Sequence, residues 1–219
     1  MDYTVELIQT GLNMIKSGLV KGTWGNISAR RSSKMWITPS GIPYEELTPE
    51  DIAVIDIPTG SQLEGKRKPS SEMPLHRILY THLPDIHGIV HTHSIYASAF
   101  AAVQETIPCY TEDQAQIIGG SIPAAAYALP GTEELAMHVL TVLQQDRFAA
   151  LLSKHGLVAV GRSLKEAWTT AEVAEKSAQV ASIIKSMHAD AQPIDEDEIK
   201  MMRSIYLNSY SKQLIHSNE

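Results

Sequence analysis

The chain has 219 residues, 43% of them hydrophobic and 20% charged, and a formal net charge of −7. Its length and apolar content suit one large domain, and its acidic balance argues against a nucleic-acid binder, which needs excess lysine and arginine to displace phosphate counterions. The single cysteine, Cys109, rules out an intrachain disulfide framework and a cysteine-rich zinc site. No uninterrupted apolar stretch reaches the roughly 18 residues of a membrane span, so we expect a cytoplasmic protein without membrane or nucleic-acid partners.

The first part of the chain mixes a helix with short strands. Acids come early and apolar residues recur at helical spacing up to Leu19, which predicts a helix of the mature fold and not a signal peptide. Turn residues then punctuate predicted strands within residues 26–30, 34–41 and 51–60. A helix begins around Ser71, since Pro74 is tolerated only in a first helical turn.

The second part continues the mixture. The expected elements are a buried strand over 86–93, a helix over 94–103 with Ser94 as N-cap, a helix over 132–145, two strands around a His-Gly turn over 148–161, and a helix from Ser163 with a capping box to Glu166. An acidic hinge then leads to a final helix or tail. Because the elements lack regular βαβ alternation, we expect a mixed α/β fold that is not of the Rossmann type.

Two histidines, His91 and His93, stand one residue apart at the end of the predicted buried strand. Alternate strand residues point to the same face, so both imidazoles can reach one metal ion, and imidazole suits zinc. A catalytic site takes three protein ligands and leaves a position open, and His155, at a strand end beside a glycine, is the best third candidate. We expect the other histidines, including His76 and His138, to be ordinary surface or satisfied core residues.

Three turns are rich in small hydroxyl and amide residues: "GNIS" at 25–28, "TPSG" at 38–41 and "PSSE" at 69–72. Such loops can present hydroxyl and backbone N–H groups to a phosphate, and the last precedes a helix whose dipole favours an anion. On spacing alone, Glu72 is a first-turn acid that stabilises its own helix.

Taken in order, "GNIS", "ITPSGIPYEEL", "KPSSEMPLHR", "IVHTHS" and "HGLVAVG" resemble the class II aldolase and epimerase family of L-fuculose-1-phosphate aldolase and L-ribulose-5-phosphate 4-epimerase. The resemblance runs from about residue 5 to about 185. It implies one domain over residues 1–219, with its core in 5–185 and a C-terminal helix or tail in 193–219. It also implies a central, largely antiparallel sheet flanked by helices in three α/β/α layers.

The resemblance implies roles for the motif residues. His91, His93 and His155, together with Glu72, would bind a divalent metal, zinc or else manganese or cobalt, and Glu72 would also be the acid/base. The implied phosphate pocket consists of Asn26, Ser40, Gly41, Ser70 and Ser71.

Glutamate after the double serine favours an aldolase within this family. The implied reaction cleaves a ketose 1-phosphate of the fuculose, ribulose or deoxypentulose type to dihydroxyacetone phosphate and a short aldehyde. Glu72 would protonate the enediolate carbon, a general-acid role that calls for a raised pKa. A pentulose-phosphate 4-epimerase and a sugar-phosphate dehydratase of the same family stay open, as do a structural metal site in a binding protein and a metal-free scaffold.

This chain differs from the aldolases of the family at the residue that donates a proton on the aldehyde side. There the aldolase has a tyrosine from a neighbouring subunit, whereas this chain offers Glu112 or Asp113, which are equally well read as plain loop acids. The tail tyrosine of the aldolases would correspond to Tyr206 or Tyr210. The family builds its site across a subunit boundary, so we expect a homotetramer with inter-subunit active sites.

Overall fold

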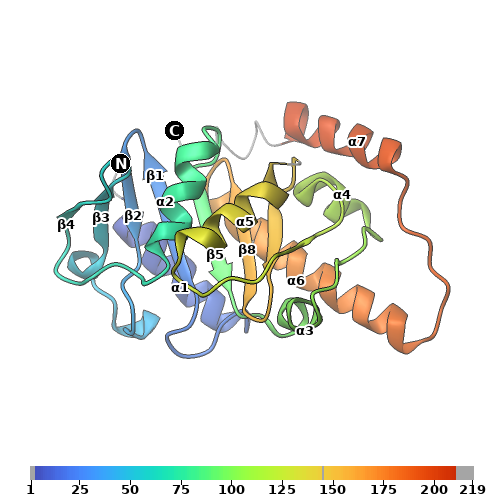
Figure 1. Cartoon of the computed structure of the whole chain (residues 1–219), viewed down its shortest axis with the longest axis horizontal. Helices are drawn as coiled ribbons and strands as arrows, with labels where there is room; N and C mark the ends of the chain where they lie inside the picture. The colour runs from blue at the N-terminus through green and yellow to red at the C-terminus, as the bar shows by residue number, and fades with distance from the viewer. Residues whose placement is uncertain (1–2, 145, 211–219) are drawn as a thin grey trace.

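An eight-stranded sheet forms the middle layer of the computed structural model, which describes residues 3–144 and 146–210 (Figure 1). The strand order is β4-β3-β2-β1-β5-β8-β7-β6, and every neighbouring pair is antiparallel except β6 and β7. The strands are β1 (Asn26–Arg31), β2 (Lys34–Ile37), β3 (Ala53–Asp56), β4 (Gln62–Glu64), β5 (Gly88–Thr92), β6 (Ala124–Ala125), β7 (Ala149–Leu152) and β8 (Gly156–Gly161). The largely antiparallel sheet confirms the predicted fold class.

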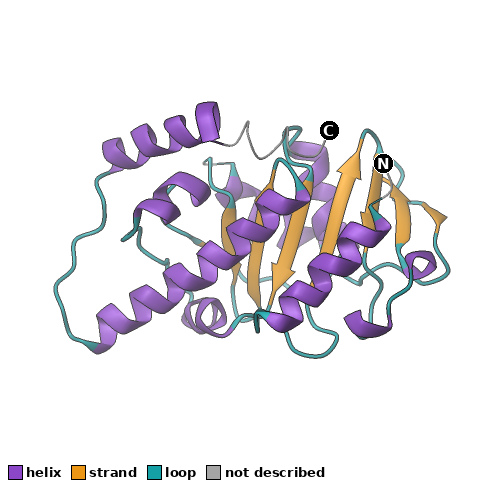
Figure 2. Ribbon diagram, turned by 180° about the vertical axis from the view of Figure 1, so that it is seen from behind, coloured by secondary structure: helices purple, strands orange, loops and turns teal. Residues whose placement is uncertain are grey.

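Helices cover both faces of this sheet (Figures 1 and 2). One face carries α2 (Met73–His82) and α5 (Glu133–Leu143), and the other carries α1 (Thr4–Lys16), α3 (Ile95–Val103) and α6 (Leu164–Ser186). At one end of the sheet, α4 (Glu112–Ile118) packs against α6 and against α7 (Glu196–Ile205). The 3-10 turns η1 (Tyr44–Glu46) and η2 (Pro49–Asp51) and the π-helical turn η3 (Tyr206–Tyr210) complete the described elements. Within the described ranges, no helix is long and apolar enough to cross a bilayer.

The alternation of side chains along the central strands decides what faces α2. In β5, Ile89 belongs to the core under α2 and α5, whereas Val90 belongs to the core on the opposite face. His91 lies two residues after Ile89 and therefore points to the α2 side. In the neighbouring strand β1, Asn26 pairs with His91 and Ser28 pairs with Ile89, so both polar side chains lie under α2 as well.

The N-terminus of α3 is capped by a different group from the one predicted. Ser94 occupies the N-cap position, but its hydroxyl makes no capping hydrogen bond in the structure. Instead the Glu175 carboxylate of α6 accepts hydrogen bonds from the backbone N–H groups of Tyr96 and Ala97, each at 2.9 Å. A tertiary contact thus satisfies the helix end that directly follows His93.

A buried ionic cluster ties the C-terminal segment to the domain. Glu166 is 4% exposed, and its carboxylate accepts hydrogen bonds from the backbone and side chain of Arg162 and, at 2.9 Å, from the Tyr206 hydroxyl. The predicted capping box is therefore half formed: the Ser163 hydroxyl accepts from the Glu166 N–H, but the carboxylate turns to Arg162. Burial raises the pKa of Glu166, yet the hydrogen bonds from Arg162 outweigh burial and the pKa is lowered.

Glu166→Gln should therefore destabilise the protein by about 3 kcal/mol, because it leaves a largely buried guanidinium without its counter-charge. The free energy of unfolding, measured by urea denaturation, checks this value. Glu172→Gln, an exposed change on the same helix, is the matched control and should cost less than about 0.5 kcal/mol. Equal stabilities of the two variants would show that the cluster contributes little.

Candidate metal centre and active site

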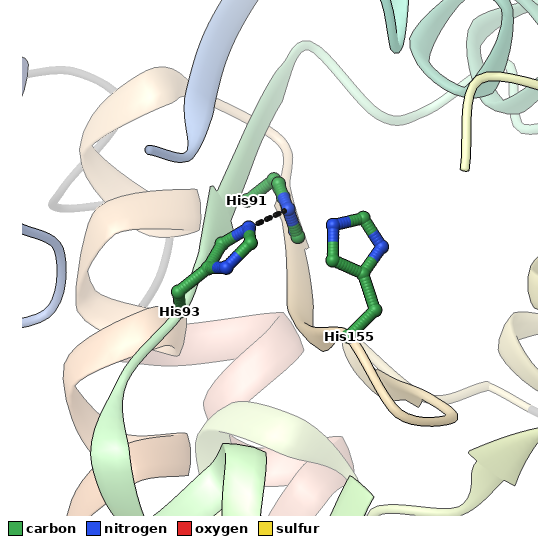
Figure 3. A group of neighbouring side chains, drawn as sticks. All are labelled: His91, His93 and His155. Atoms are coloured by element: carbon green, nitrogen blue, oxygen red, sulfur yellow. Dashed lines mark hydrogen bonds between the residues drawn. The ribbon is translucent and has the colours of Figure 1, made fainter. Parts of the chain in front are cut away.

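Three imidazoles meet beside the end of β5 (Figure 3). His91 lies in β5, His93 directly follows this strand, and His155 lies in the turn between β7 and β8. One ring nitrogen from each residue lies within 4.8 Å of the other two. The structure thus brings together the three histidines predicted from the sequence, and this group could hold a metal ion.

The pairing of β5 with β8 brings His155 to the other two rings. His91 pairs with Val158 and Thr92 pairs with Leu157, so the turn before β8 comes back to the end of β5. A Cβ at Gly156 would lie 2.3 Å from the carbonyl oxygen of Thr92. Only glycine permits this close approach of the two backbones.

Hydrogen bonding and burial favour the form of the imidazoles that binds a cation. The His91 Nδ1–H donates to the Leu157 carbonyl at 2.9 Å, so in the neutral ring Nε2 carries the lone pair. Burial, together with the neighbouring imidazoles, lowers the pKa of His93 to about 3 and that of His155 to about 4. At neutral pH these rings are uncharged, which is the form that binds metals.

Glu72 faces the imidazoles from the N-cap position of α2. Its Oε2 lies 3.1 Å from Nε2 of His91, and its Oε1 lies 3.6 Å from Nδ1 of His155. Among the described residues, Oε1 and the His155 Nδ1 are both buried without a hydrogen-bond partner. The lone pair on Nε2 of His91 and the two carboxylate oxygens of Glu72 face one another, which favours a cation between them. The donor set therefore fits a divalent metal.

Opposing contributions set the pKa of Glu72 in the free site. Burial raises it, but attraction by His91 and His155 and the hydrogen bond from Asn26 outweigh burial, and the pKa lies below its ordinary value. The raised pKa expected of a general acid refers to Glu72 next to the metal-bound substrate, and it stays a prediction. Glu72 is a carboxylate at neutral pH and is set to accept a proton first.

The polar loops line one cavity of about 360 Å³ next to the imidazoles. The Ser71 backbone N–H donates to the Ser40 hydroxyl at 2.9 Å and so joins two of the loops. The lining includes all five residues of the predicted phosphate pocket together with Glu72, His93 and His155: Asn26, Ser40, Gly41, Ser70 and Ser71. Their role in phosphate binding stays a prediction.

Three further candidate residues, Glu112, Asp113 and Tyr206, do not line this cavity. Glu112 is exposed in the first turn of α4, and Asp113 accepts hydrogen bonds from Lys176 at 2.8 and 2.9 Å. Tyr206 is 5% exposed and its hydroxyl donates to Glu166. The side chain of Tyr210 lies outside the described part of the chain.

The sequence alone predicts that His76 is an ordinary histidine outside the site. It is a fully buried core residue, as expected, but its Nε2 lies 2.5 Å from the Oδ1 of Asn26, which in turn contacts Glu72. A signal was present in the sequence. Glu72, His76 and Tyr80 recur every four residues along a helix, a spacing that places three polar groups on one helix face.

His93→Ala should lose most of the bound metal, because it removes one of three converging ligands, whereas His138→Ala should retain it. His138 is a half-buried histidine of α5 that bonds to the Ala126 carbonyl, away from the three converging imidazoles, so it serves as the matched control. Metal content after dialysis against zinc, measured by atomic emission, gives the comparison. Equal losses in the two variants would mean that the ligands are misassigned.

Metal binding should also persist in mild acid. Because the pKa values of His93 and His155 are lowered to about 3 and about 4, these rings stay neutral until the pH falls through that range. An ordinary imidazole with a pKa of about 6.5 is mostly protonated at about pH 5.5. Zinc titration against a competing dye, at neutral pH and at about pH 5.5, should show a smaller loss of affinity than protonation of all three ligands would cause, because His93 and His155 stay neutral at both pH values. A steep loss just below neutrality would contradict the buried, neutral state of the rings.

Comparison with known proteins identifies the family. Residues 5–182 match the sequence model of the Class II Aldolase and Adducin N-terminal domain. The 5-deoxy-D-ribulose 1-phosphate aldolase of Bacillus thuringiensis serovar kurstaki is 39% identical over 197 residues, which cover 89% of this chain and 91% of that protein. The L-fuculose phosphate aldolase of Escherichia coli strain K12 is 40% identical over 193 residues, 88% of each chain. A solved L-fuculose 1-phosphate aldolase structure superposes with a TM-score of 0.89 at 34% identity, over 94% of this chain and 96% of that one. The chain therefore belongs to the class II aldolase family, as its sequence motifs indicated.

Proposed function

We propose that this protein is a metal-dependent aldolase that cleaves a small ketose 1-phosphate to dihydroxyacetone phosphate and a short aldehyde. The observation that carries the proposal is the shared cavity, in which neutral imidazoles, small hydroxyl residues and a carboxylate meet, one oxygen of which has no hydrogen-bond partner among the described residues. The names of the two relatives, a 5-deoxyribulose 1-phosphate aldolase and a fuculose phosphate aldolase, support a substrate of the deoxypentulose, ribulose or fuculose type.

One nitrogen from each of His91, His93 and His155 would hold the metal, which we propose to be zinc, with manganese or cobalt as alternatives. The bound ion would supply Lewis acidity, which would stabilise the negative charge that develops on the substrate during cleavage. The hydrogen bond from His91 to the Leu157 carbonyl orients one of these ligands.

Glu72 moves the proton at the hydroxymethyl carbon. Its Oε2 is held by the Asn26 amide at 2.8 Å, and its Oε1 is buried next to His155 without a hydrogen-bond partner among the described residues. The lowered pKa supports a carboxylate that takes this proton in the aldol direction and returns it during cleavage.

The phosphate would lie against the loops that carry Ser40, Gly41, Ser70 and Ser71. Ser40 and Ser71 are exposed in the cavity, and Gly41, with φ of +74°, leaves open space where a side chain would stand. These loops approach the N-terminus of α2, where the helix dipole favours an anion.

We also propose that the active protein is a homotetramer whose sites lie between subunits. Two large apolar side chains beside His93 support this proposal: Trp24 is 64% exposed and Ile95 is 63% exposed, and both line a hollow that His93 shares. Of the remaining candidates whose side chains the structure describes, Glu112 suits a proton donor supplied to a neighbouring site because it is exposed, whereas Asp113 is paired with Lys176 and Tyr206 with Glu166.

Chelation should abolish release of dihydroxyacetone phosphate, because the proposed cleavage depends on the Lewis acidity of a metal held by three neutral imidazoles. Zinc, cobalt or manganese should restore the activity, since imidazole binds all three ions. The assay is a panel of ketose 1-phosphates of the fuculose, ribulose and deoxypentulose types, each with and without chelator. Full activity of a metal-free preparation would contradict the proposal. Epimerised or dehydrated products in place of triose phosphate would point to another activity of the family.

Glu72→Gln should lower turnover by about 10²–10⁴-fold, because a neutral amide cannot exchange a proton with carbon. A dihydroxyacetone phosphate mimic should bind this variant nearly as well as the wild type. Glu45→Gln, an exposed change elsewhere in the chain, is the control and should leave turnover unchanged. Near-normal turnover of the Glu72 variant with bound metal would assign the proton transfer to another residue.

Sedimentation equilibrium should give four times the chain mass of 24.1 kDa for the active protein. Closed symmetry is the common outcome for soluble homo-oligomers. A fully active monomer would contradict the inter-subunit site.

A further inference from the structure

A continuous chain of hydrogen bonds leads from the buried side of α2 to Glu72. The Tyr80 hydroxyl lies 2.9 Å from the Ser28 hydroxyl, which lies 2.6 Å from Nδ1 of His76. His76 Nε2 lies 2.5 Å from Oδ1 of Asn26, and Asn26 Nδ2 donates to Oε2 of Glu72 at 2.8 Å. Every member is at most 6% exposed.

The chemistry of the groups gives this chain a single direction. An ionised carboxylate only accepts, so Asn26 must turn its NH₂ group to Glu72 and its carbonyl oxygen to His76. His76 must then donate from Nε2, which leaves the lone pair of a neutral ring on Nδ1. The Ser28 hydroxyl donates to that lone pair and accepts from the Tyr80 hydroxyl. Reversing any one bond leaves two acceptors or two donors facing each other in a buried place, at a cost in stability.

Two features hold the ring of His76 in this state. Burial lowers its pKa to about 3, although the nearby Glu72 charge opposes the shift, so the ring is neutral at physiological pH. At the far end, the guanidinium of Arg30 donates to the Tyr80 carbonyl at 2.5 Å and lies 5.3 Å from the centroid of the Tyr80 ring. Arg30 of β1 therefore contacts both the backbone and the ring of the residue at the far end of the hydrogen-bond chain.

We propose that His76 is a positioning residue for Glu72. By donating from Nε2 it holds the Asn26 amide in the one orientation that binds Oε2 of Glu72, and this leaves Oε1 directed at the imidazoles and the substrate. The inference rests on the proposed role of Glu72 in proton transfer. Without the fixed amide, the carboxylate could rotate, and a proton-transfer group that is poorly oriented loses much of its effect.

The test is proton exchange at the hydroxymethyl carbon of dihydroxyacetone phosphate in deuterated water, with the full-length, metal-loaded protein and no aldehyde. His76→Phe keeps a planar ring but removes both nitrogens, and it should slow exchange by about 10–100-fold, as is typical for the loss of a residue that orients a site group. The KM for dihydroxyacetone phosphate should change by less than about threefold, because the phosphate loops are intact. His76→Gln, whose amide both donates and accepts, should recover most of the rate, and His138→Gln is the matched control with a wild-type rate.

The outcomes separate this inference from the proposed function. Wild-type protein that shows no exchange contradicts the proposed function and the inference with it. Wild-type exchange together with normal exchange by metal-loaded His76→Phe overturns the inference alone. If His76→Phe does not fold, Ser28→Ala serves instead: it removes the donor to Nδ1, and a rate equal to wild type overturns the inference. Nitrogen-15 spectra of the wild-type protein give a readout independent of activity, since His76 should be neutral with its proton on Nε2, and a proton on Nδ1 would contradict the assigned direction.

Discussion

The close pairing of β5 with β8 is the constraint on which the site depends. Gly156 approaches the Thr92 carbonyl so closely that no other residue fits, and the turn that precedes it places His155 against His91 and His93. The same pairing supplies the Leu157 carbonyl that fixes the tautomer of His91. Backbone geometry, not side-chain flexibility, therefore sets the convergence of the three imidazoles, as a preorganised metal site requires.

The contact between α2 and β1 is a second constraint, because polar side chains of the helix pack against polar side chains of the strand. Buried polar groups are costly unless they are hydrogen-bonded, and this contact satisfies nearly all of them. Among the residues that the structure describes, two atoms beside this contact lack a hydrogen-bond partner, Oε1 of Glu72 and Nδ1 of His155, and both face the proposed metal and substrate. Unsatisfied groups concentrated at one point in an otherwise paired network are expected where a ligand completes the bonding.

The sequence predicted well what depends on local spacing, and less well what depends on distant contacts. The paired histidines and the His-Gly turn lie in short, strongly patterned segments, so both the strands and the ligands could be anticipated. The contact between His76 and Asn26 spans 50 residues, and the capping of α3 by Glu175 spans 79 and 78, so neither follows from local pattern. The helix α4 was missed for a related reason: its seven residues are too few to show helical periodicity, and its packing against α6 and α7 stabilises it. The lowered pKa of Glu72 likewise reflects neighbours brought together only by folding.

A crystal structure of the zinc-loaded protein with a bound dihydroxyacetone phosphate mimic tests the central claim most directly. Anomalous scattering at the zinc edge should give one ion about 2.0–2.1 Å from a ring nitrogen of each of His91, His93 and His155. The Asn26 amide should still hold Oε2 of Glu72, and Oε1 should point at the hydroxymethyl carbon of the mimic, with the phosphate against Ser40 and Ser71. An ion bound elsewhere, or a Glu72 carboxylate turned away from the mimic, would contradict the account.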